Sequence, residues 1–194
     1  MKNCSPRART GIKCLLLAVV LAACGPVATD VFRDESMDFA AIRTVAVMPL
    51  SNQTRETLAT ERVRDVFATT LLSTGAVYVI PPGEVNRGIS RAAIAEAAFP
   101  APEDIVKFGS IVKVDAVIIG VIREYGEVRS GNSTSQVISL SMKMIETQTG
   151  RVVWSASSTQ GGISFKDRLL GGGGLPMNQI TEKAVNDIID KMFR

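Results

Sequence analysis

Few side chains of this 194-residue chain could perform catalysis, because the chain contains no histidine. That absence removes every mechanism in which histidine activates a serine or cysteine, or binds a metal. Ser110 and Lys113 have the S-x-x-K spacing in which a lysine one helical turn away could deprotonate a serine. Neither a Lys-Thr-Gly nor a Ser-Asx-Asn element accompanies them, so a chance match is the stronger interpretation. We predict that the chain is not an enzyme.

Two further patterns could bind ligands. The glycine run 171–174 could cradle a phosphate, but a phosphate loop continues with Gly-Lys-Ser/Thr, whereas Leu175 follows here, which favours a linker or hinge. Four carboxylates of the second half are candidate cation ligands: Asp115, Glu124, Glu127 and Glu146. Solvated positions on alternating strand faces explain these carboxylates more simply. We therefore predict no cofactor and no metal ion.

Cys24 stands in a sequence with defined chemistry. Four basic residues and an apolar run over 14–23 precede it, as in a secretory signal. As a helix this run would reach about 15 Å, half of the roughly 30 Å that a membrane span requires. The sequence Leu-Ala-Ala-Cys-Gly over 21–25 resembles the bacterial lipobox, in which the cysteine sulfur accepts a diacylglyceryl group. The alternative is a plain signal peptide with an incidental cysteine.

The lipobox resemblance implies a signal peptide over 1–23, a lipid anchor at Cys24 and a location on the periplasmic face of the outer membrane. Proteins with this motif are usually retained in the inner membrane by aspartate after the cysteine, and this chain has Gly25. Cleavage leaves 18 Lys and Arg against 19 Asp and Glu, a formal net charge of −1. That balance gives no reason to expect nucleic-acid binding.

The mature chain is predicted to be one domain on a short tether. Residues 24–41 are assigned to the acylated tether, because small and acidic residues there show no sustained period of 2 or 3.6. If flexible, such a tether would hold the domain roughly 20–25 Å from the bilayer. Residues 42–194 predict a single α/β (α+β) domain with a mixed sheet and the order β-α-β-α-α-β-β-β-α. Its predicted strands are 44–50, 76–80, 114–128, 136–145 and 151–158, and its helices are 56–73, 84–98, 102–113 and 177–192.

Three segments of this domain carry a family resemblance. They are Val-Ala-Val-Met-Pro-Leu-Ser-Asn-Gln-Thr over 45–54, Val-Asp-Ala-Val-Ile-Ile-Gly over 114–120 and Glu-Thr-Gln-Thr-Gly-Arg-Val-Val-Trp over 146–154. In this order they resemble envelope lipoproteins of the curli-secretion CsgG and penicillin-binding-protein-activator LpoB type, whose shared domain is similar to the TolB N-terminal domain. The resemblance covers roughly 42–192. It implies a periplasmic module that binds other proteins in envelope assembly, secretion or cell-wall synthase activation, with no catalytic residues.

A subunit of a CsgG-like oligomeric export channel is the alternative function. In that family the pore is built from two long hairpins per protomer, and each membrane-crossing strand needs about 9–11 alternating residues. The strands predicted here are all needed for the domain's own sheet. We therefore place the channel second to a partner-binding module, which itself could form a homo-oligomer.

Four residues are candidates for partner binding. Phe165, Leu169 and Leu170 lie beside cations, directly before the four glycines and outside the regular strand and helix patterns. They could dock an envelope protein or a neighbouring copy, or tuck under the closing helix. Trp154 could be an interface anchor, although core packing on a strand is the favoured interpretation.

Replacing Cys24 by serine tests the anchor. We expect Cys24→Ser to give an uncleaved or soluble product, because two or three acyl chains provide stable membrane attachment. The measurements are membrane fractionation and incorporation of labelled palmitate. If Cys24→Ser fractionates like the wild type, and neither form takes up palmitate, the prediction is wrong.

Overall fold

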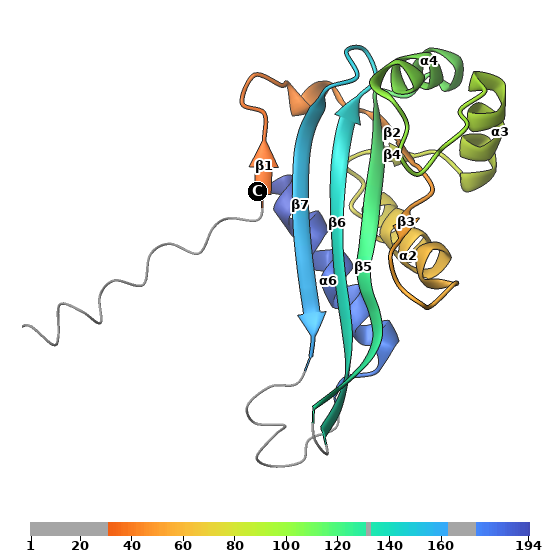
Figure 1. Ribbon diagram of the computed structural model, residues 1–194. Helices are drawn as coiled ribbons and strands as arrows, with labels where there is room; N and C mark the ends of the chain where they lie inside the picture. Colours follow the sequence, from red (N-terminus) through yellow and green to blue (C-terminus); the bar gives the residue numbers. More distant parts are fainter. Residues whose placement is uncertain (1–30, 131–132, 163–173) are drawn as a thin grey trace, which may run out of the picture.

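The computed structural model describes residues 31–130, 133–162 and 174–194. Its centre is one seven-stranded mixed sheet with the strand order β1-β7-β6-β5-β2-β4, in which short β3 pairs with β5 (Figure 1). The strands are β1 (Val31–Arg33), β2 (Thr44–Val47), β3 (Ser51–Asn52), β4 (Tyr78–Val79), β5 (Ala116–Ser130), β6 (Ser133–Glu146) and β7 (Val152–Gly161). The helices are the 3₁₀ turn η1 (Phe39–Ala41), α2 (Ala59–Ser73), α3 (Pro82–Ala92), α4 (Pro102–Val112) and α6 (Met177–Phe193).

The predicted fold class and element order are confirmed. From residue 42 onward the long elements follow the predicted sequence, β2-α2-β4-α3-α4-β5-β6-β7-α6. β2 is parallel to both of its neighbours, β4 and β5, as expected for strands joined through helices. β5, β6 and β7, which correspond to the last three predicted strands, form an antiparallel meander. The first part of the sheet is therefore parallel and the second part antiparallel.

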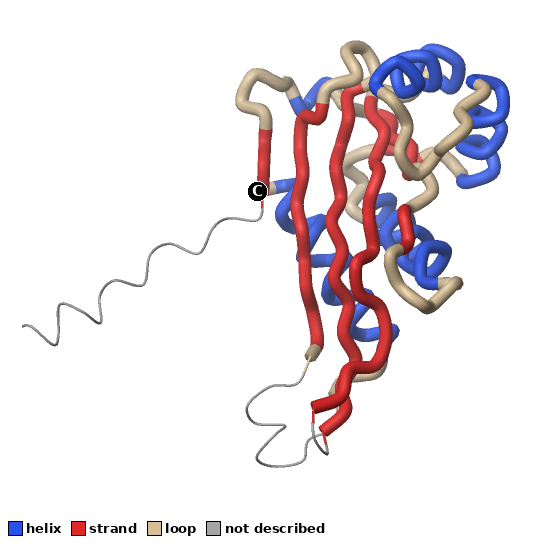
Figure 2. Tube along the Cα trace, in the orientation of Figure 1, coloured by secondary structure: helices blue, strands red, loops and turns tan. Residues whose placement is uncertain are grey.

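Helices cover the two faces of the sheet unequally (Figure 2). α2 and α6 pack on one face, where Phe67, Ile188 and Trp154 belong to the larger hydrophobic core. α3 and α4 pack on the other face, where Phe108 and Ile145 belong to a second, smaller core. Among the described residues, only the parallel end of the sheet thus has helices on both faces, and most of the meander is covered on one face.

The meander shows the alternation that its sequence predicts. Ile138, Leu140 and Met142 on β6 are fully buried against the larger core. The intervening Ser139 and Ser141 are half-buried on the opposite face. This period of two buries one face and leaves the other partly exposed to solvent, as is usual for antiparallel sheets.

Residues 31–41, which the sequence analysis assigns to the tether, belong instead to the fold. β1 pairs antiparallel with β7, with Val31 opposite Ala156 and Arg33 opposite Trp154. Val31 and Phe39 pack against the larger core. A three-residue strand is too short to show a period of two, so only its pairing with β7 reveals it. The ordered domain thus extends at least to Val31.

Helix α3 ends earlier than predicted, at Ala92 and not near residue 98. Ala93 adopts the left-handed conformation with a φ of 54°, and its N–H donates to the carbonyls of Ile89 and Ser90. This cap ends the helix six residues before the apolar pattern does.

The carboxylate of Asp115 joins the start of β5 to the start of β2. Its Oδ2 accepts hydrogen bonds from the N–H groups of Arg43 at 2.9 Å and Thr44 at 2.8 Å, and from the Thr44 hydroxyl at 2.9 Å. Burial alone would raise the pKa of Asp115, but these hydrogen bonds and the Arg43 charge outweigh it and lower the pKa. Asp115, considered above as a cation ligand, therefore has a structural role.

Replacing Asp115 by alanine tests this role. Asp115→Ala leaves two N–H groups and a hydroxyl without their acceptor, so we expect the free energy of unfolding at pH 7 to fall by about 1–3 kcal/mol. Glu182→Ala, at an exposed position in the middle of α6 (Met177–Phe193), is the control and should change it little. The measurement is denaturant unfolding. Equal stability of Asp115→Ala and the wild type at pH 7 would contradict this role.

The effect of Asp115→Ala on the free energy of unfolding should depend on pH. The pKa of Asp115 in the folded state lies below its ordinary value of 3.8. The stabilisation that the Asp115 carboxylate provides is therefore fully present above pH 3.8, and it is lost as the pH falls through the folded-state pKa. The difference in unfolding free energy between wild type and Asp115→Ala should shrink below about pH 4.

Candidate functional site

Several predicted site residues lie outside the described residues: Cys24, Phe165, Leu169 and Leu170. Their predicted roles as lipid anchor and docking segment stay predictions. Across 31–130, 133–162 and 174–194, no helix is both long and apolar enough to cross a membrane.

Trp154 is a core residue, so its candidate role in partner binding is wrong. Its side chain is 0% exposed, and its indole N–H donates to the carbonyl of Lys191 on α6 at 3.3 Å. On β7 it lies opposite Met144, on the face of the meander that packs against the larger core. No part of this side chain is available to a partner while the domain is folded.

The serine–lysine pair shows no sign of catalytic geometry. The Ser110 hydroxyl donates to the carbonyl of Lys107 in its own helix at 2.7 Å. Lys113 follows α4 as its C-cap, with a φ of 63°. The two side chains are not joined by any hydrogen bond recorded for the described residues.

The four candidate carboxylates do not form a cation site. Asp115 binds the start of β2, Glu127 pairs with Arg129 at 2.7 Å, and Glu146 accepts a hydrogen bond from the Thr149 hydroxyl. Within the part of the chain that the structure describes, no group of three or more Asp, Glu, Cys or His side chains is arranged to hold a metal ion.

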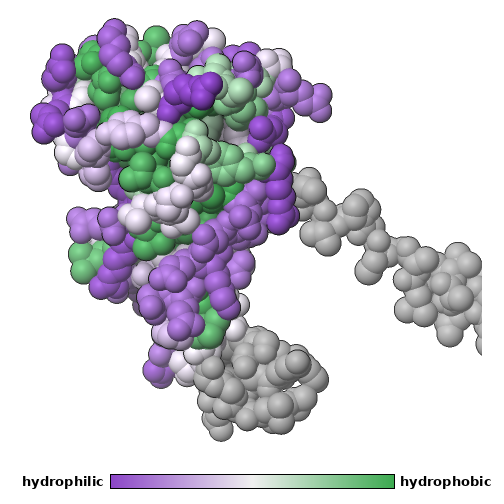
Figure 3. Space-filling view, turned by 180° about the vertical axis from the view of Figure 1, so that it is seen from behind, coloured by the Kyte–Doolittle hydropathy of each residue, from purple (hydrophilic) through white to green (hydrophobic). Residues whose placement is uncertain are grey.

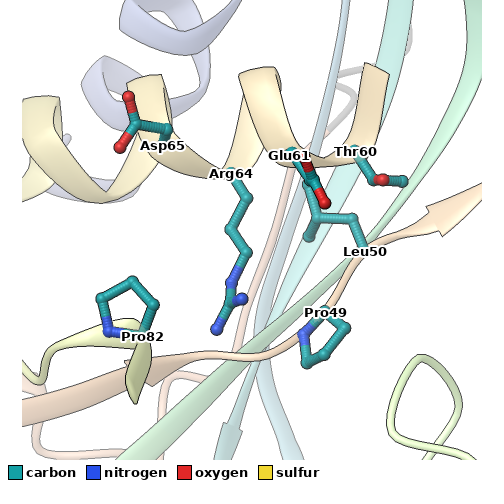
Figure 4. A pocket seen from close by; sticks show the side chains of 7 residues that line it. All are labelled: Pro49, Leu50, Thr60, Glu61, Arg64, Asp65 and Pro82. Atoms are coloured by element: carbon teal, nitrogen blue, oxygen red, sulfur yellow. The ribbon is translucent and has the colours of Figure 1, made fainter. Parts of the chain in front are cut away.

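One pocket, with a volume of about 440 Å³ and charged side chains among apolar walls, lies where β2 ends (Figure 4). We call it the Arg64 pocket. Its lining residues are Pro49, Leu50, Thr60, Glu61, Arg64, Asp65 and Pro82. The Arg64 side chain leaves α2 and extends between the two prolines, where its Nε and Nη2 donate to the carbonyl of Val47 at 3.0 and 2.7 Å. Burial lowers the pKa of Arg64, but an arginine keeps its charge in proteins.

A second pocket, of about 320 Å³, is mostly apolar and lies where η1 meets the end of α6. We call it the Phe193 pocket. Its walls include Phe39, Val77, Met192 and Phe193, with Arg33 and Arg43 among the polar lining residues. Figure 3 shows the side that carries α2 and α6, where hydrophobic surface gathers between hydrophilic borders. Phe193 is 49% exposed, so an aromatic ring is open to solvent at this pocket.

Arg33 builds one wall of the Phe193 pocket from the N-terminal strand. Its guanidinium stacks on the Phe39 ring at 3.9 Å and donates to the carbonyl of Met192 at 2.8 Å. A cation is favourable at that position, because the C-terminus of a helix carries partial negative charge. β1, η1 and α6 are thus fixed to one another at this pocket.

Sequence reasoning missed both pockets. The Phe193 pocket joins residues from the two ends of the chain, and no local spacing connects Arg33 with Met192. The one available signal was the presence of Phe32, Arg33 and Phe39 in a segment otherwise rich in small and acidic residues. Arg64 lies within the predicted helix 56–73, and nothing in that prediction indicates its hydrogen bonds to the carbonyl of Val47.

Comparison with solved structures identifies the class of fold. The PelC dodecamer from Paraburkholderia phytofirmans is similar with a TM-score of 0.56 and 15% identity, covering 84% of this chain and 94% of that chain. Lipoprotein GNA1162 from Neisseria meningitidis is similar with a TM-score of 0.52 and 22% identity, covering 76% of this chain and 99% of that chain. At these identities the likeness shows a shared α+β fold. The curated proteins contain no match to this chain.

The family model described as peptidoglycan-synthase activator LpoB matches residues 27–159, about two thirds of the chain. The chain therefore belongs to the LpoB family. This match confirms the LpoB part of the resemblance derived from the sequence. It begins before β1 and ends within β7, so it includes every strand of the sheet except the last two residues of β7.

Truncating Trp154 tests whether it is a core residue. We expect Trp154→Ala to lower the free energy of unfolding by about 3–5 kcal/mol, because it removes a fully buried side chain and leaves a cavity. Trp154→Phe, which keeps an aromatic ring, should cost less. Both are measured by chemical denaturation. If Trp154→Ala is as stable as the wild type, the core assignment fails.

Proposed function

We propose that this chain is a lipid-anchored envelope protein that activates a peptidoglycan synthase by binding to it, without catalysing a reaction itself. One observation carries the proposal, namely the LpoB family match over 27–159. That family is described as an activator of peptidoglycan synthases, which supports a non-enzymatic role for the family as a whole. The lipobox at Cys24 supports an anchor on the periplasmic face of the outer membrane.

The Phe193 pocket is the surface that we propose for docking. Protein interfaces are enriched in aromatic residues, methionine and arginine, and their strongest contacts come from side chains that fill apolar pockets. This pocket combines Phe39, Phe193 and Met192 with Arg33 and Arg43. An apolar partner side chain flanked by a carboxylate would fit it, since the two guanidinium groups favour negative charge nearby.

The export channel is not part of the proposal. β5 and β6, the longest hairpin of the described chain, form the middle of the domain's own sheet between β2 and β7. If this hairpin instead formed part of a membrane barrel, the core that Ile122, Ile138 and Leu140 share with α6 would be disrupted. No observation favours that rearrangement over partner binding.

Photo-crosslinking in cells tests the partner and the surface together. A crosslinking amino acid at position 193 should capture a peptidoglycan synthase, identified by mass spectrometry. The matched control is position 99, because Phe99 is 54% exposed and lines a different, much smaller pocket with Ile119 and Lys143. Crosslinks from position 193 only to copies of this chain, or to envelope proteins other than synthases, would overturn the proposal.

Replacing Phe193 by serine tests whether this side chain contributes to the affinity for the synthase. We expect Phe193→Ser to weaken binding to the captured synthase at least tenfold, about 1.4 kcal/mol, because it removes the exposed ring from the pocket. Its effect on the unfolding free energy should stay within about 0.5 kcal/mol, as is usual at surface positions. Phe99→Ser should change neither quantity. Loss of binding by both variants alike would count against the Phe193 pocket.

A further inference from the structure

The Arg64 pocket contains a cation held in a fixed position. Both Nε and Nη2 of Arg64 donate to the same acceptor, the carbonyl of Val47, the last residue of β2. A guanidinium has five N–H donors, and this fork uses two of them. Within the described parts of the chain, no acceptor is found for the remaining donors, which include both on Nη1. The side chain is thus oriented before any ligand arrives, which lowers the entropic cost of binding.

A carboxylate faces the same pocket without neutralising the cation. Glu61 lies three residues before Arg64 on α2, and both side chains project toward the loop at Pro49 and Leu50 (Figure 4). Asp65 lies at the rim. The ion pairs found among the described residues include neither Glu61 nor Asp65 with Arg64. Opposite charges therefore share this cavity without an ion pair between them in the described part of the chain.

The pocket also has a suitable size and position. Its volume of about 440 Å³ lies within the range of small-ligand sites, and Pro49, Leu50 and Pro82 give it apolar walls. It lies at the carboxyl end of β2, a strand with parallel neighbours on both sides. In sheets of parallel strands, ligands bind at the carboxyl ends of the strands. The preferred place is where the connections from two adjacent strands run in opposite directions along the sheet.

The charges select the class of ligand. A purely anionic group such as phosphate would be attracted by Arg64 but repelled by Glu61 and Asp65. A purely cationic group would meet the Arg64 guanidinium. A group with a carboxylate and an ammonium a few bonds apart can satisfy both side chains, with a bidentate pair to the guanidinium.

We infer that the Arg64 pocket binds a short zwitterionic peptide, whose carboxylate accepts hydrogen bonds from Arg64 and whose ammonium donates to Glu61. The peptide backbone lies between Pro49, Leu50 and Pro82. This site is separate from the Phe193 pocket and does not depend on the synthase partner.

Binding of defined dipeptides to the full mature chain tests this inference by calorimetry or by NMR titration. The probe is dialanine with free ends, and the comparisons are N-acetyl-dialanine, dialanine amide and inorganic phosphate. We expect the free dipeptide to bind with a Kd on the order of 1 mM or tighter, and each blocked form to bind at least tenfold more weakly. The inference would be overturned if free and blocked dipeptides bind equally or if phosphate binds more tightly than the free dipeptide. It would also be overturned if the free dipeptide does not bind at about 10 mM, roughly tenfold above the expected Kd.

A substitution at Glu61 is the decisive variant, because replacing Arg64 also removes its bonds to Val47 and could unfold the chain. Glu61→Gln should weaken binding of the free dipeptide to the level of its N-acetyl form. It should leave binding of the N-acetyl form unchanged, because that ligand has no ammonium. Glu182→Gln, at an exposed position on α6, is the matched control and should bind all ligands like the wild type. An equal effect of Glu61→Gln on both dipeptides would show that the residue does not recognise the ammonium and would overturn the assignment.

Discussion

Burial of β2 on both faces is the constraint on which the rest of the structure depends. Val45 and Val47 point into the larger core beside α2, whereas Ala46 and Met48 point into the smaller core beside α3 and α4. All four side chains are at most 2% exposed. A strand buried in this way must have paired neighbours on both edges, because its backbone N–H and carbonyl groups have no access to water. β4 and β5 supply that pairing, Asp115 fixes the start of β5 to the start of β2, and the meander continues from β5.

The sequence predicts the elements of this core well, because their patterns are long. Continuous apolar residues in β2 indicate two-sided burial, and the alternation along β6 indicates a single buried face. The short strands β1 and β3 were not predicted, since a period of two needs several residues to appear, whereas two-residue β4 was found only because it lies within the longer apolar run 76–80. The boundary of the domain was misplaced for this reason. What holds Val31–Arg33 in place is the edge of β7, a partner more than 120 residues away in the sequence.

The candidate sites were harder to predict than the fold, and for a different reason. Trp154 could have been assigned to the core from its phase on β7, since it is in register with Met144 on the buried face of β6. The two pockets have no such signal. Arg64 gains its orientation from Val47, and Arg33 from Phe39 and Met192, through contacts that exist only in the folded chain. Charge and aromatic character can be seen in a sequence, but the presence or absence of a partner for each group cannot.

The position of β1 also limits where the proposed activator can work. With Cys24 as the anchor, seven Cα–Cα steps separate the lipid from Val31, and fully extended chain reaches at most about 25 Å over that number of residues. A tether that continued to residue 41 would have allowed more than twice this reach. Arg33, which lines the Phe193 pocket, lies two residues further on, so the distance from the anchor to Arg33 is at most about 32 Å. If Cys24 is the anchor, the domain of the proposed activator stays within this distance of the membrane. The proposed synthase partner would then have to bring its own docking segment close to the outer membrane.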